Sequence, residues 1–187
     1  MLFTSHYESP IGGITIASDG ENIIGLWFDG QKYFGDTLGA DNAEAKALGE
    51  ASIEDLTSLP VFEKTQGANN EKVCLPVFEL THKWLDLYFS GQIPDFTPHI
   101  KLLGSDFRKK VWSILLEIPY GNTMSYGEIA HRISPRMSAQ AIGAAVGHNP
   151  ISLIVPCHRV VGSNGSLTGY AGGLDKKLWL LDLERRT

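Results

Sequence analysis

Apolar and polar positions alternate in short runs over the first thirty residues. Residues 13–18 follow this period-two pattern, which is typical of a strand with one buried face. The dipeptides Asp19-Gly20 and Asp29-Gly30 enclose a second apolar run and are typical of turns. The pattern therefore predicts a small antiparallel sheet at the start of the chain.

Helical spacing replaces this alternation from Val77 to Tyr88. Gly91 suits the end of such a helix, and residues 92–98, with two prolines, suit a linker. Between sheet and helix, residues 41–72 are acidic, with Ala-rich helical pieces and a proline break, and we expect an irregular connection there. Residues 1–98 are thus expected to form an α/β domain, with a small antiparallel sheet plus a helix.

The second half of the chain is expected to be mainly helical. After Ser105, a suitable cap, apolar residues recur at i, i+4, i+7, i+8 and i+11. Two short helices follow, the first opened by a capping box at Ser125 and the second capped by Ser138. Two short helices joined by a turn match the helix-turn-helix pattern, whose second helix meets DNA. Residues 99–187 are therefore expected to form a winged-helix or helix-turn-helix-like catalytic domain.

Small residues make up almost all of the second short helix, residues 139–147. Such a surface allows tight packing against a neighbouring helix, and it also allows close approach to a narrow groove such as the minor groove of DNA. A protein that reads the major groove needs Arg, Asn or Gln at several positions. Only Gln140 meets this requirement, so sequence-specific regulation is disfavoured.

Charge is unevenly distributed along the chain. The formal net charge is -5, but residues 1–98 hold five Lys and no Arg against fifteen acids, whereas residues 99–187 hold eleven Lys and Arg against six acids. The second half therefore suits a polyanionic partner, although basic residues more often form a solvated face. A motif has to accompany the charge before it indicates DNA binding.

Targeting signals are not evident in the sequence. No apolar run approaches the roughly 20 residues that a membrane helix needs, and the N-terminus lacks the pattern of a secretory signal. The two cysteines, Cys74 and Cys157, fit free thiols in a reducing compartment. We therefore expect a cytoplasmic protein that does not interact with membranes.

Candidate chemistry centres on Cys157, which follows a proline and precedes His158. A cysteine attacks as the thiolate, with an ordinary pKa of about 8.5, and so needs a base or a positive charge nearby. His158 can supply the base, and Arg159 adds local positive charge. On spacing alone, an inert buried cysteine remains an open alternative.

A third group should orient the imidazole, and Glu184 in the last helix is our choice. It lies one turn beyond an apolar stripe that we assign to Leu174, Leu178 and Leu181. The neighbouring Lys176 and Lys177 are expected to form an exposed helical face.

Three segments resemble the O6-alkylguanine-DNA alkyltransferases, also called methylated-DNA–protein-cysteine methyltransferases. They are residues 149–161 with the specific Pro-Cys-His-Arg-Val signature, the Gly-Tyr-Ala-Gly-Gly run at 169–173, and residues 179–184. The first hundred residues match only as the small α/β domain that precedes the catalytic domain in that family. The resemblance implies a DNA repair protein that flips O6-alkylguanine out of double-stranded DNA and transfers the alkyl group irreversibly to its own cysteine.

The resemblance also implies roles for individual residues. Cys157 attacks the alkyl carbon, His158 takes the thiol proton through a bound water, and Glu184 holds the imidazole. Tyr126 helps to protonate the departing base, and Asn149 braces the site between the second short helix and a strand that carries the cysteine. Contacts with DNA or the base are expected from six residues: Ser138, Gln140, Val146, Val160, Tyr170 and Ala171. A thioether is inert to water, so each molecule is expected to react once.

One position departs from the family pattern. Well-known members carry an arginine where this chain has Gln140, and that arginine fills the space left by the flipped base. Glutamine is shorter and uncharged, which predicts a weaker wedge.

The zinc ligands of some relatives are not evident either, since Cys74 has no second thiol nearby and His6 and His82 form no recognisable motif. We expect a monomer with no metal, no cofactor and no obligate protein partner.

Three other classes of function remain open. A damage-binding module without chemistry would lack the nucleophile, which this chain retains. A cysteine hydrolase using Cys157, His158 and Glu184 would turn over repeatedly without DNA. A winged-helix regulator would bind a defined sequence and would survive loss of the thiol. Stoichiometric labelling of the protein by alkylated DNA separates the transferase from all three.

Overall fold

The computed structural model describes residues 2–38 and 75–186. The irregular connection expected over residues 41–72, and Cys74 beside it, lie outside the described residues. Within the described ranges, the helices are too short or too polar to cross a membrane.

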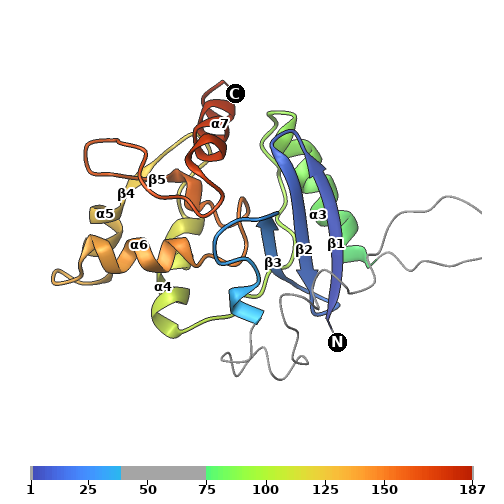
Figure 1. Cartoon of the computed structure of the whole chain (residues 1–187), viewed down its shortest axis with the longest axis horizontal. Helices are drawn as coiled ribbons and strands as arrows, with labels where there is room; N and C mark the ends of the chain where they lie inside the picture. Colours follow the sequence, from blue (N-terminus) through green and yellow to red (C-terminus); the bar gives the residue numbers. More distant parts are fainter. Residues whose placement is uncertain (1, 39–74, 187) are drawn as a thin grey trace, which may run out of the picture.

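The N-terminal half is built on an antiparallel sheet in the order β1-β2-β3, as the alternating pattern predicts (Figure 1). Its strands are β1 (Phe3–Ser9), β2 (Gly12–Ser18) and β3 (Ile23–Phe28). Gly20 and Gly30 lie in the predicted turns with φ of 109° and 71°, values that glycine adopts without a steric penalty. Every residue of β3 is buried, so this strand lies in the interior of the molecule.

Helix α3 (Pro76–Phe89) packs on strands β1 and β2. Its buried face includes Trp84 and Tyr88, which belong to the apolar spacing seen in the sequence. The helix ends at Phe89, Ser90 is its C-cap, and Gly91 follows with φ of 77°, which confirms the predicted stop.

The free edge of β3 joins the sheet to the second half of the chain. The Leu26 N–H donates to the Pro150 carbonyl, and the Ser152 N–H donates to the Leu26 carbonyl, both at 2.8 Å. Ile23 pairs in the same way with the segment around Ile100. One hydrophobic cluster includes buried residues from both halves. Because the two halves share this core, the boundary between two domains at residue 98 stays a prediction.

The second half is mainly helical, and its helix starts are those expected from the sequence. Helices α4 (Asp106–Leu116), α5 (Tyr126–Ile133) and α6 (Ala139–Gly147) pack against one another. Their caps are Ser105, Ser125 with a complete capping box, and Ser138.

Trp112 ties α4 to α6 from within the core. Its indole N–H donates to the Ala145 carbonyl at 2.8 Å, and the ring is completely buried. The small residues of α6 let α4 approach closely enough for this bond. Tight helix packing, one of the two explanations for the small-residue composition, is therefore present in the fold.

Helix α7 (Leu174–Arg185) buries only part of the predicted stripe, namely Leu181 with Glu184 one turn beyond it. Leu174 and Leu178 are 47% and 46% exposed, whereas Lys177, Leu180, Leu181 and Glu184 are buried. Apolar residues occur on several sides of this helix, so spacing alone could not select a face. Lys177 and Glu184 determine the buried face, because both have buried polar partners, which are described below.

The residues before Cys157 do not form the strand that the prediction placed there. Ile151 makes one isolated bridge to Leu26, and Leu153 has a left-handed φ of 70°. Cys157 itself begins a 3-10 turn, η2 (Cys157–Arg159), which leads into β5 (Val160–Val161) beside β4 (Met124–Ser125). Pro156 has no N–H to donate, which disfavours a continuous ladder at this point.

Candidate active site

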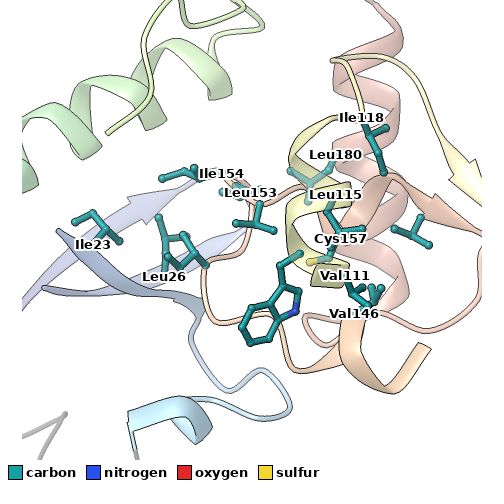
Figure 2. Close-up of a cluster of buried hydrophobic side chains, with 14 of the residues drawn as sticks. Ile23, Leu26, Val111, Leu115, Ile118, Val146, Leu153, Ile154, Cys157 and Leu180 are labelled. Carbon is teal, nitrogen blue, oxygen red and sulfur yellow. The ribbon is translucent and has the colours of Figure 1, made fainter. Parts of the chain in front are cut away.

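Cys157 lies between the apolar core and a cavity. Its side chain packs among buried residues of α4, α6 and α7, and the residue is only 4% exposed (Figure 2). It also lines a cavity of about 640 Å³, within the size range of small-molecule sites. The cavity is bounded by Tyr126, by one face of α6, by residues 168–171, and by Lys32 and Tyr33 after β3. The sulfur is thus buried yet borders a space that could hold a ligand.

Asn149 holds the sulfur in place. Its Nδ2 donates to the Val155 carbonyl at 2.8 Å and to Cys157 Sγ at 3.1 Å, while its Oδ1 accepts from the Ile151 N–H at 3.1 Å. Burial raises the pKa of the Cys157 thiol, and the Asn149 hydrogen bond and the charge of Lys177 oppose this rise. The resting group is therefore a thiol that needs a base before it can attack.

His158 and Glu184 form a fully buried pair, with 2.7 Å between Nε2 and Oε1. An ionised carboxylate can only accept, so Nε2 carries the proton in this pair. Burial lowers the pKa of His158, although the hydrogen bond to Glu184 works in the opposite direction, and the ring is therefore neutral near pH 7. Nδ1 is buried without a hydrogen-bond partner in the described part of the chain, so it is free to accept a proton.

Glu184 is the centre of a larger buried network. The Tyr88 hydroxyl donates to it at 2.7 Å, the Gly121 N–H at 3.0 Å, and the Arg159 guanidinium at 2.9 Å from Nε to Oε2. Burial tends to raise the pKa of Glu184, but its hydrogen bonds with His158 and Arg159 and the charge of Arg159 outweigh burial and lower the pKa to about 2. The carboxylate is therefore ionised at neutral pH.

Arg159 acts on Glu184, contrary to the prediction that its charge would act on the thiol. Its Nη1 donates to the Ile118 carbonyl at 2.6 Å, and its guanidinium lies 5.6 Å from the centre of the Tyr120 ring. The side chain points toward the carboxylate because Glu184 would otherwise be a buried anion with too few partners.

Lys177 provides the positive charge near the thiol, and the expectation of an exposed face was wrong for this residue. Its side chain is completely buried, and its Nζ donates to the carbonyls of Thr168 and Gly169 at 2.8 and 3.1 Å. The Tyr126 hydroxyl donates to the same two carbonyls at 3.1 and 3.4 Å. Lys177 and Tyr126 thus hold one loop against the cavity.

The structure places four of the six predicted contact residues around the cavity: Gln140, Val146, Tyr170 and Ala171. Ser138 caps α6 by accepting from the Ala141 N–H, and Val160 is completely buried; neither lines the cavity. The Tyr170 hydroxyl is buried without a partner among the described residues, so it can bind a polar atom inside the cavity. The functional roles of all six remain predictions.

Four residues of this site were not identified as such from the sequence. The sequence pattern places Tyr88 on the apolar face of α3 and Lys177 on a solvated surface. Lys32 and Tyr33 carried no signal, because only the folded chain brings them to the cavity. The described residues contain no group of three or more His, Cys, Asp or Glu that could hold a metal ion.

Comparison with known proteins adds to this geometry. Residues 2–102 match the family described as 6-O-methylguanine DNA methyltransferase, ribonuclease-like domain, and residues 106–186 match its DNA binding domain. A methylated-DNA–protein-cysteine methyltransferase of Methanosarcina acetivorans is 38% identical over 98% of both chains. The chain belongs to the 6-O-methylguanine DNA methyltransferase family.

Other members of this methyltransferase family resemble the chain in sequence or structure. A methylated-DNA–protein-cysteine methyltransferase of Mycolicibacterium paratuberculosis is 55% identical over 54% of this chain, a match that spans only 62% of that relative's length. The crystal structure of Mycobacterium tuberculosis OGT in complex with DNA has a TM-score of 0.72 and 35% identity, covering 98% of this chain and 93% of that one.

Replacing Lys177 by methionine is expected to slow alkyl transfer at pH 7 by about tenfold and to shift the pH–rate profile toward higher pH. The ammonium helps to lower the thiol pKa, and methionine keeps the length of the side chain without its charge. Burial lowers the pKa of Lys177 itself to about 8, so its contribution is present below pH 8 and fades above it. Transfer rates measured from pH 6 to 10 test this.

Lys176→Met is the matched control for this experiment, because Lys176 lies on the same helix with its Nζ 5.8 Å from the centre of the Phe28 ring. An unshifted profile in the Lys177 variant would show that its charge does not act on the thiol.

Proposed function

We propose that this protein repairs DNA by taking the alkyl group from O6-alkylguanine onto Cys157 in a single irreversible reaction. The observation that carries the proposal is the Cys157 sulfur at the cavity wall, held by Asn149 beside a buried His158–Glu184 pair. The family to which the chain belongs and the DNA complex of its structural neighbour support this function.

In the proposed reaction, the thiol proton passes through a bridging water to Nδ1 of His158. Glu184 keeps the Nε2 proton in place and stabilises the imidazolium that forms. The sulfur then attacks the alkyl carbon, so an S–C bond forms while the C–O6 bond breaks and its electron pair leaves with guanine. Tyr126 supplies a hydrogen bond or proton to the departing base. The product is a thioether, and no group in the site can reverse its formation.

The proposed partner is double-stranded DNA, docked against α6. A base carrying the lesion must leave the stack to reach a sulfur inside a cavity, at a cost of a few kcal/mol. The small residues of α6 bring its backbone close to a groove, and Gln140 lies exposed at the side of the cavity. We further propose that the protein acts as a monomer in the cytoplasm, where a free thiol persists.

The decisive experiment is incubation with duplex DNA that carries labelled O6-methylguanine. One labelled methyl per protein, located on Cys157 by mass spectrometry, is the expected result. Repeated turnover would indicate a hydrolase, and binding without label would indicate a damage-binding module or a regulator.

Gln140→Arg is expected to raise the transfer rate on duplex DNA by about five- to tenfold and to leave the rate on single strands unchanged. A longer, charged side chain can fill the space of the extruded base and bond to its orphaned partner, and such contacts contribute about 1–3 kcal/mol. Single strands need no extrusion and serve as the internal control. Equal duplex rates for the two proteins would disprove the weak-wedge hypothesis.

A further inference from the structure

Two residues of the N-terminal half, Lys32 and Tyr33, form part of the wall of the cavity that contains Cys157. They follow β3 directly, and in Figure 1 this stretch of chain runs beside the end of α6. Both side chains are exposed, Tyr33 at 37%, so they lie where the cavity opens to solvent.

Contacts on two sides fix the position of this stretch. The Lys32 N–H donates to the Ala171 carbonyl at 3.0 Å, which ties it to the loop that borders the cavity. The Tyr33 ring lies 3.8 Å from the His148 ring at the end of α6, between centroids, and His148 Nδ1 is 2.6 Å from Asp36 Oδ2. Tyr33 also adopts a left-handed φ of 63°, a conformation that these contacts must hold in place.

The charge of Lys32 has no acidic partner in the part of the chain that the structure describes. Its Nζ lies 4.8 Å from the centre of the Tyr33 ring. The nearby carboxylate of Asp36 is already engaged, by His148 at 2.6 Å and by Arg108 at 3.9 Å. Surfaces that bind along a nucleic-acid backbone combine positive charges with aromatic rings. Lys32, which lies over the Tyr33 ring at the opening of the cavity, has this combination.

We propose that Lys32 pairs with a backbone phosphate next to the extruded nucleotide, so that the acidic N-terminal half contributes a contact to the DNA interface. This inference rests on the proposed function. If α6 meets DNA and the cavity takes the base, the backbone of the extruded nucleotide passes the opening where Lys32 lies. Tyr33 is a positioning residue, because its ring holds this stretch on His148 and lies under the ammonium.

Lys32→Gln tests the contact through the salt dependence of binding to duplex DNA that carries O6-methylguanine, with Cys157 replaced by serine in every protein compared so that no alkyl transfer occurs. Losing one phosphate contact should reduce the slope of log Kobs against log salt by about 0.9, and should weaken binding about equally on all sequences. Lys32→Arg should keep the wild-type slope. Tyr33→Ala should reduce the slope by part of this amount, whereas Tyr33→Phe, which keeps the ring, should keep the wild-type slope.

Lys83→Gln is the matched control. Lys83 is an exposed lysine of the same half, on α3, and its Nζ also lies over an aromatic ring, 5.5 Å from the centre of Phe96. It is expected to retain the wild-type slope. Equal slopes for wild type and Lys32→Gln would overturn the inference, as would an equal loss in Lys83→Gln.

Failure of this inference can be told apart from failure of the proposed function. Wild-type protein should take one methyl per molecule from duplex DNA, whatever the salt slope of Lys32→Gln. A wild-type protein that takes no methyl would refute the function, while the comparison of salt slopes would still decide whether Lys32 contacts DNA.

Discussion

Cys157→Ser is expected to reduce alkyl transfer by more than about a thousandfold, which places it below detection in a stoichiometric assay. Serine can accept the same hydrogen bond from Asn149, and the residue is buried, so the fold and the cavity should persist. An alcohol is a far weaker nucleophile than a thiolate at neutral pH, and catalytic nucleophiles show losses of this size when they are removed. Labelled DNA and intact-protein mass spectrometry measure the result.

Cys74→Ser is the control, since the chain has two cysteines. This variant should still accept one methyl per molecule. Binding of Cys157→Ser to duplex DNA should match wild type, which shows that lost transfer reflects lost chemistry. Labelling of Cys157→Ser at the wild-type level would place the acceptor elsewhere and refute the proposed mechanism.

Local rules predicted much of the fold. The sheet, the end of α3 and the caps at Ser105, Ser125 and Ser138 follow from turn dipeptides and capping residues, whose preferences act over three or four positions. The pairing of β3 with the segment before Cys157 could not be predicted in this way. It joins residues more than a hundred positions apart, and neither segment carries a local signal for the other.

Site residues that belong to a sequence motif could be predicted, whereas those whose role depends only on their burial in the folded chain could not. Cys157 and His158 lie in a specific signature, and the structure brings Glu184 to His158 as expected. Lys177 looked like a surface residue because lysine is almost never fully buried without partners. Its partners are two backbone carbonyls of a loop, which no side-chain pattern reports.

Glu184→Gln is expected to lower the free energy of unfolding by about 3–5 kcal/mol and to slow transfer by about a hundredfold. Glutamine keeps the shape of the side chain but removes the charge that compensates Arg159, and breaking one partner of a buried ion pair has costs of this size. The amide of glutamine can also donate to Nε2 of His158. Nε2 would then be the acceptor and Nδ1 would carry the proton, which is the wrong tautomer for taking the thiol proton at Nδ1. Urea unfolding at pH 7 and single-turnover transfer rates measure the two effects.

The dependence of stability on pH separates this charge effect from a general loss of packing. The folded-state pKa of Glu184 is about 2, below its ordinary value of 4.5, so its contribution is complete above pH 4.5 and is lost as the pH falls toward 2. Wild type should therefore lose more stability than Glu184→Gln over that interval. The control is Asp182→Asn on the same helix, where the acid is 42% exposed and pairs with Arg185 at 3.7 Å, so this variant should follow wild type. Parallel stability curves for wild type and Glu184→Gln would mean that the carboxylate is not held ionised by His158 and Arg159, and the proposed orientation of the imidazole would lose its basis.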